Sequence, residues 1–196
     1  NPVKRARIVA LGAKVIEQGD MGGSATSKGA AEFAHEHGHY FLDDASHPLV
    51  PAGTATIAAE IFDEISKPDI LFVPMGDTAL IRGVAAEAKR RHPDVRVIGV
   101  QAEQAPAYVQ SWQQGRVVIP DERDTIADGL ASLRPLEANV IAIRELVDEV
   151  GLVAEQEMLH AIRILLLEEH VVAEPSGAAA AAAFLQNPSA YADANI

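Results

Sequence analysis

The sequence contains no cysteine, few aromatic residues (5%) and no surplus of basic residues. Without cysteine the chain has neither disulfides nor thiolate metal ligands, and it suits a reducing cytoplasm, where we expect it to be located. The formal net charge is −12. Nucleic acids and anionic membranes bind proteins through clustered Lys and Arg. We therefore expect no nucleic-acid partner, and we expect small molecules or other proteins instead.

Long apolar runs are also missing. The longest, SGAAAAAAFL at residues 176–185, is too short and too rich in alanine to span a bilayer. The start, NPVKRARIVALG, lacks the apolar core of a signal peptide. Hydrophobic residues still make up 48% of the chain, enough for one sizeable domain or for one domain plus part of another. We expect a soluble protein with no membrane partner.

Short apolar segments alternate with amphipathic helical ones, which is typical of an α/β fold with a parallel sheet and helices on both faces. The expected strands are Lys14–Ile16, His39–Leu42, Ile70–Pro74, Val95–Val100 and Val147–Val153. The expected helices are Pro2–Leu11, Ser27–His37, Thr54–Ile65, Ala79–Arg91 and Glu155–His170. The segment DDASHPLVPAG at residues 43–53 is the best candidate for a boundary, because it is rich in turn-forming residues.

The stretch VPMGDTALIRGV, residues 73–84, runs from an expected strand through Gly76 into an expected helix. Such a turn leaves unpaired backbone N–H groups at the positive end of a helix dipole, where phosphate groups bind. An ordinary strand-to-helix turn, with Asp77 or Thr78 as the N-cap, explains the same residues. The stretch by itself leaves both interpretations open.

Four further stretches surround this one in a characteristic order. In sequence order the five are HPLVPAGTATIAAEIFDEI, FVPMGDTALIRGVAAEAK, VIGVQAEQAPAYVQSW, TIADGL and VVAEPSGAAAAA. Together they resemble the pyridoxal-phosphate enzymes of fold type II, specifically the serine/threonine dehydratase group, over nearly the whole chain. The resemblance implies a parallel twisted sheet with helices on both faces. It also implies that residues 1–45 form part of the smaller domain and residues 46–196 form a larger cofactor-binding domain, incomplete at its C-terminus.

The resemblance implies a binding site for pyridoxal 5'-phosphate in the larger domain. The turn expected to hold the cofactor phosphate consists of Gly76, Asp77, Thr78, Ala79 and Leu80, while Gly129 and Glu174 are expected near the cofactor ring. This turn is usually glycine-rich in the family, so Asp77 is a departure. A carboxylate about 4 Å from a phosphate charge costs about 1 kcal/mol in water and about 4 kcal/mol at an effective dielectric constant of 20. Asp77 therefore either points away as a helix cap or weakens the site.

The sequence does not identify the catalytic residues. The segment carrying the lysine that holds the cofactor, and the Gly-Gly-Asn segment that follows the alanine-rich helix in the family, have no counterpart here. We therefore expect the chain to be a fragment of a longer protein and inactive alone. The stretch TSKGAA imitates the lysine motif, but the helical spacing of Ala31 and Ala34 leaves Lys28 exposed. An exposed lysine with an ordinary pKa is a poor Schiff-base nucleophile.

No metal site is expected. The stretch HEHGH places His35, His37 and His39 at alternating positions across a helix end, where histidine more simply complements the helix dipole. Some members of the family bind a divalent cation through acidic residues after the strand that ends in GV. Gln101 and Ala107 occupy those places here, so that cation site is expected to be lost.

The resemblance implies a cytoplasmic amino-acid lyase that converts serine or threonine into a 2-oxo acid and ammonia. One alternative is a racemase or a β-replacement enzyme, since one fold supports several reactions. Another is a non-catalytic, Rossmann-like binding module. The expected partners are a small amino-acid substrate and further copies of the chain, because family members are commonly dimers or tetramers.

Overall fold

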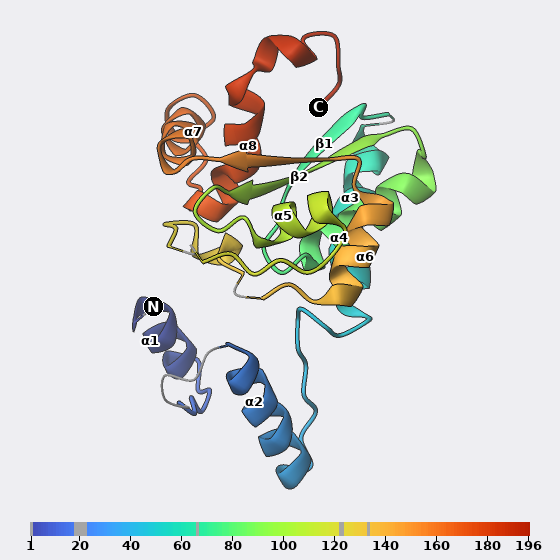
Figure 1. Cartoon of the computed structure of the whole chain (residues 1–196). Helices are drawn as coiled ribbons and strands as arrows, with labels where there is room; N and C mark the ends of the chain where they lie inside the picture. The colour runs from blue at the N-terminus through green and yellow to red at the C-terminus, as the bar shows by residue number, and fades with distance from the viewer. Residues whose placement is uncertain (1, 18–22, 66, 122–123, 133) are drawn as a thin grey trace. The chain divides into compact units, whose positions relative to one another are not determined.

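The computed structural model describes residues 2–17, 23–65, 67–121, 124–132 and 134–196. Contacts within the chain divide it into two compact units, Asn1–Leu42 and Asp43–Ile196 (Figure 1). Assignment of the first unit to a smaller domain of the family stays a prediction. Within the described residues, no helix is long and apolar enough to cross a membrane.

The first unit contains two helices, α1 (Pro2–Ala10) and α2 (Gly23–His37). The strands expected at Lys14–Ile16 and His39–Leu42 are wrong, because both segments lie outside any strand. A strand needs a neighbouring strand for its backbone hydrogen bonds, and the described part of this unit offers none. His37 Nδ1 lies 2.9 Å from the Phe33 carbonyl oxygen, and its ring stacks on Phe33 at 4.1 Å between centroids.

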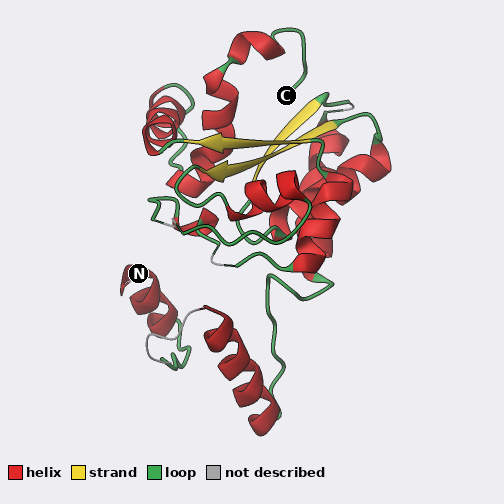
Figure 2. Cartoon of the chain, viewed as in Figure 1, coloured by secondary structure: helices red, strands yellow, loops and turns green. Residues whose placement is uncertain are grey.

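The second unit is built on a three-stranded parallel sheet with strand order β1-β2-β3 (Figure 2). The strands are β1 (Ile70–Pro74), β2 (Arg96–Ala102) and β3 (Glu149–Val153). In the register, Phe72 lies opposite Ile98, and Val100 lies opposite Gly151. The α/β class expected from the sequence is confirmed, and the three strands fall within two residues of the expected bounds.

Helices cover both faces of this sheet (Figures 1 and 2). They are α3 (Val50–Glu64), α4 (Ala79–Arg91), α5 (Ala107–Gln114), α6 (Glu137–Leu146), α7 (Glu155–Leu167) and α8 (Pro175–Gln186), with short 3-10 helices η1 (Asp128–Leu130) and η2 (Pro188–Tyr191). The bounds of α4 are those expected. The sequence analysis missed α6, and α7 ends before the expected His170, which has a positive φ of 57°.

Two apolar clusters fill the space on either side of the sheet. Side chains of β1 alternate between them: Leu71 and Val73 pack with α3, α4, α5 and α6, whereas Ile70 and Phe72 pack towards α7 and α8. Successive strand residues point to opposite faces, so a strand that is buried on both sides is apolar at nearly every position. The carboxyl ends of β1 and β2 thus emerge between two layers of helices.

Helix α4 is held tightly against α3. A β-carbon on Gly83 of α4 would overlap Thr54 Oγ1 and the carbonyl oxygen of Pro51. The Thr54 hydroxyl donates to the Ala79 carbonyl oxygen at 2.9 Å, which ties α3 to the first turn of α4. The close approach therefore sets the position of the helix that follows β1.

We expect Gly83→Ala to lower the free energy of unfolding by about 1–3 kcal/mol, because the added methyl group meets the Pro51 backbone. Gly53→Ala is the matched control in α3, since a β-carbon there meets no atom within 4 Å. That control should be neutral or stabilising by up to about 1 kcal/mol, as alanine favours helix over glycine. Urea unfolding of both variants measures the difference, and equal effects would contradict the close packing.

Candidate functional site

The turn from β1 into α4 presents a series of unpaired backbone amides. The Met75 amide donates to the Val100 carbonyl oxygen at 2.7 Å and so continues the β ladder. Beyond it, the amides of Gly76, Asp77, Thr78 and Leu80 reach no acceptor among the described residues. These groups lie at the amino end of α4, where the helix dipole favours a negative charge. The geometry is that of an anion cradle.

The Asp77 side chain accepts a hydrogen bond from one amide of this turn. Its Oδ1 accepts a hydrogen bond from the Ala79 N–H at 2.9 Å, so its carboxylate caps the start of α4. Ala79 itself is buried and is not among the residues that line the cleft described below. The Ala79 amide is thus already paired, and the role expected for Ala79 in holding a phosphate stays a prediction.

Thr78 adopts a conformation that is unusual for its residue type. Its φ is 80° and its ψ is −2°, in the left-handed region, which costs a residue other than glycine roughly 1–2 kcal/mol. Thr78 as a whole is 1% exposed, and its Oγ1 has no hydrogen-bond partner among the described residues. A buried hydroxyl without a partner is costly, and an anion seated in the turn would satisfy it.

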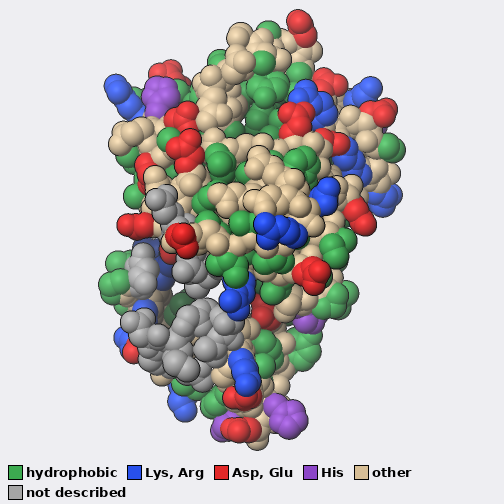
Figure 3. Space-filling view, in the orientation of Figure 1, with side chains coloured by type: hydrophobic (Ala, Val, Ile, Leu, Met, Phe, Trp, Pro, Cys, Tyr) green, Lys and Arg blue, Asp and Glu red, His purple; other side chains and the backbone are tan. Residues whose placement is uncertain are grey.

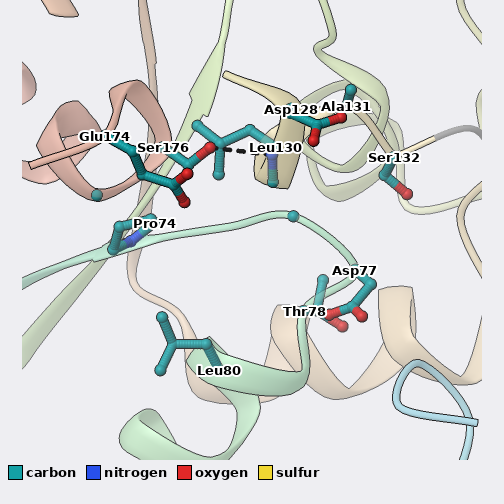
Figure 4. Close-up of a pocket in the computed structure, with 13 residues that line it drawn as sticks. Pro74, Asp77, Thr78, Leu80, Asp128, Leu130, Ala131, Ser132, Glu174 and Ser176 are labelled. Atoms are coloured by element: carbon teal, nitrogen blue, oxygen red, sulfur yellow. Dashed lines mark hydrogen bonds between the residues drawn. The ribbon is translucent and has the colours of Figure 1, made fainter. Parts of the chain in front are cut away.

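Gly76 allows a second segment to close the site. A β-carbon there would overlap the carbonyl oxygen of Gly129, which belongs to η1. The Gly129 amide in turn donates to Ser176 Oγ at 3.0 Å, and Ser176 lies in the first turn of α8 (Figure 4). The β1–α4 turn, η1 and the start of α8 therefore meet at one place.

Between these three elements lies a cleft of about 440 Å³, within the range of small-molecule sites. Six of the seven residues expected from the sequence line it: Gly76, Asp77, Thr78, Leu80, Gly129 and Glu174. The sequence analysis missed Pro74, Asp128, Leu130, Ala131, Ser132, Ser176 and Gly177. Asp128 and Ser176 stand inside the motifs TIADGL and AEPSGA, which were the available signal for them.

The charged side chains that line the cleft are all acidic. They are Asp77, Asp128 and Glu174, and no Lys or Arg is among the described lining residues (Figure 4). An anion in the cleft would therefore meet backbone amides and the helix dipole, with no basic side chain among the described lining residues. Elsewhere, on the face drawn in Figure 3, basic side chains lie interspersed with acidic ones.

Gln101, at the end of β2, has a structural role. It is fully buried, and its Oε1 accepts hydrogen bonds from the amides of Tyr108 and Val109 at 3.0 Å each, at the start of α5. Across the described ranges, no group of three or more His, Asp or Glu side chains is arranged to hold a metal ion.

Lys28 lies in the first unit, on α2. Its side chain is 78% exposed, and its Nζ lies 3.8 Å from Glu32 Oε1. It thus has the exposed setting that the helical spacing predicted.

Comparison with known proteins places this geometry in context. The family model described as pyridoxal-phosphate dependent enzyme matches residues 1–196. The L-threonine ammonia-lyase of Thermotoga maritima is 36% identical over 175 residues, which are 89% of this chain and 43% of that protein.

Two solved structures have closely similar folds. The threonine deaminase from T.th. superposes with a TM-score of 0.89 at 30% identity, covering 97% of this chain and 63% of that one. Maize serine racemase superposes with a TM-score of 0.88 at 25% identity, covering 98% and 60%. The chain thus spans less than two thirds of the length of each of these proteins.

We expect Gly76→Ala to weaken binding of inorganic phosphate roughly tenfold or more, because the methyl group displaces the turn from the Gly129 carbonyl. Gly177→Ala is the control, since its β-carbon would meet only Glu174 Cγ at an ordinary 3.9 Å in the same cleft. Calorimetric titration of the two variants measures the contrast. Equal phosphate affinities would contradict a cradle at Gly76.

We expect Asp77→Asn to tighten phosphate binding roughly fivefold, since it removes a like charge worth about 1 kcal/mol and keeps an oxygen for the Ala79 amide. Asp77→Gly should also tighten binding but lower the free energy of unfolding by roughly a few tenths of a kcal/mol through loss of the cap. Asp94→Asn, beyond the other end of α4, controls for net charge. Unchanged affinity in Asp77→Asn would show that the carboxylate is held away from the anion.

Proposed function

The chain belongs to the pyridoxal-phosphate dependent enzyme family, and on that basis we propose that the cleft of the second unit binds pyridoxal 5'-phosphate. The amides of Gly76, Asp77, Thr78 and Leu80 hold the phosphate, and the Thr78 hydroxyl adds a donor. The observation that carries this proposal is the set of unpaired amides at the start of α4, beside a buried hydroxyl that lacks a partner.

The remaining lining residues orient the cofactor. Gly129 presents backbone to the cofactor ring, because a side chain at this position would press on Ser176, 3.0 Å from an added β-carbon. Glu174 precedes α8 and is exposed on the cleft side (Figure 4). No lysine is among the described residues that line the cleft.

We propose that the whole protein is an amino-acid ammonia-lyase that acts on threonine or serine. Pyridoxal phosphate supplies the electron sink for a carbanion next to the substrate amino group. The residues of this chain would orient the bound cofactor and keep water away from it. The support is the identity of 36% to an L-threonine ammonia-lyase and the superposition on a threonine deaminase.

Amino-acid racemisation is the second candidate. The superposition on maize serine racemase, with a TM-score of 0.88, favours it, although the sequence identity is lower at 25%. β-Replacement is a further possibility on the same fold. We also propose a cytoplasmic location, a homo-oligomeric assembly and a smaller-domain role for the first unit, all by likeness to the family.

Incubation of the full-length protein with pyridoxal phosphate and L-threonine or L-serine tests the proposal. We expect a visible absorption band from bound cofactor, together with equal amounts of 2-oxo acid and ammonia. Formation of D-serine without a 2-oxo acid would favour the racemase. Failure to bind the cofactor would overturn the proposed site, and Gly53→Ala, which lies outside the cleft and adds a methyl group in open space, serves as the control.

A further inference from the structure

Asn139, in the first turn of α6, contacts the back of the anion cradle. It is 2% exposed, and its Nδ2 lies 3.1 Å from the Asp77 carbonyl oxygen and 3.0 Å from the Ala45 carbonyl oxygen. Carbonyl oxygens only accept hydrogen bonds, so the side-chain nitrogen of Asn139 must face them. Asn139 is not among the residues that line the cleft.

The Asp77 carbonyl and the Thr78 amide belong to one planar trans peptide unit and point in opposite directions. A hydrogen bond that draws the carbonyl oxygen towards Asn139 therefore turns the Thr78 N–H away from α6. Thr78 lines the cleft, and its amide is one of the unpaired donors of the cradle. The orientation of this peptide decides whether that donor is available to an anion.

The peptide orientation works against the conformational preference of Thr78. With φ at 80°, Thr78 is in the left-handed region that residues other than glycine disfavour. A half-turn of the preceding peptide would bring φ to about −100°, an ordinary value, and would turn the amide out of the cradle. Some interaction must hold the observed orientation.

The Asp77 carbonyl depends on Asn139 for that interaction, whereas the other two acceptors near Asn139 Nδ2 have further partners. The Ala45 carbonyl also accepts from Arg82 Nη2 at 2.8 Å, and the Tyr108 hydroxyl, 3.3 Å from Asn139 Nδ2, also accepts from the Leu136 amide. For the Asp77 carbonyl, Asn139 is the one donor among the described residues.

We propose that Asn139 is a positioning residue that locks the peptide between Asp77 and Thr78 in the anion-binding orientation. This inference rests on the proposed function, since it assigns a purpose to the cradle that holds the cofactor phosphate. Asn139 does not touch the phosphate, and it acts only through the Asp77 carbonyl.

The test is phosphate affinity of the cofactor-free, full-length protein, measured by calorimetry. Asn139→Leu has similar size and lacks the donor, and we expect it to weaken phosphate binding roughly 5- to 30-fold, the factor that corresponds to the left-handed penalty of Thr78. In a Thr78→Gly background the same change should cost only about twofold, because glycine adopts both signs of φ equally readily. Asn139→Ala also lacks the donor and adds no charge, and it should act in the same direction, should the leucine variant fail to fold.

Tyr108→Phe is the matched control. Burial raises the pKa of the Tyr108 hydroxyl, so it stays protonated and neutral, and its loss removes a buried polar contact of Asn139 without touching the bond to Asp77. We expect Tyr108→Phe to bind phosphate within about twofold of the parent protein. A loss as large as that of Asn139→Leu would overturn the inference, because it would point to general disruption.

Two further outcomes separate the inference from the proposed function. If Asn139→Leu lowers phosphate affinity equally in the parent protein and in the Thr78→Gly background, the inference is overturned and the phosphate site still stands. Absence of phosphate and cofactor binding in the parent protein would overturn the proposed function. A crystal structure of Asn139→Leu would then still test whether Asn139 holds the peptide between Asp77 and Thr78. The inference expects a negative φ at Thr78 in this variant, and a φ that remains near 80° would overturn it.

Discussion

Unpaired main-chain amides at the start of α4 are the feature on which the candidate site depends. Main-chain donors at a helix amino end attract an anion without any basic side chain. Here no positively charged donor is among the described lining residues, whose charged side chains are Asp77, Asp128 and Glu174. Backbone geometry, more than side-chain chemistry, therefore determines whether this cleft binds phosphate.

The surrounding fold holds that backbone in place from three directions. Helix α3 holds the first turn of α4 through the Thr54 hydrogen bond, and it can approach closely because Gly83 has no side chain. The Gly129 carbonyl abuts Gly76 from the cleft side, and Asn139 contacts the Asp77 carbonyl from behind. Each contact would be lost or distorted if the turn moved, and this explains how an energetically unfavourable conformation of Thr78 persists.

Asp77 illustrates a compromise between stability and binding. Its carboxylate stabilises the amino end of α4 by capping the Ala79 amide. The same carboxylate removes one donor from the turn and brings a negative charge towards any bound anion. The turn therefore offers an anion fewer free amides than its length suggests, and the buried Thr78 hydroxyl is a further donor without a partner among the described residues.

Local signals in the sequence were sufficient for the α/β class, the bounds of β1 and α4, and the turn between them. Apolar alternation, Gly76 and the caps act over a few residues, so their effects are readable without a structure. The strands expected at Lys14–Ile16 and His39–Leu42 failed because a strand exists only where another strand pairs with it. Only the tertiary structure decided how the peptide between Asp77 and Thr78 is oriented, since the Asn139 contact joins residues 62 positions apart. The left-handed φ of Thr78 and the approach of Gly129 to Gly76 likewise arise from packing between distant segments, which no local pattern encodes.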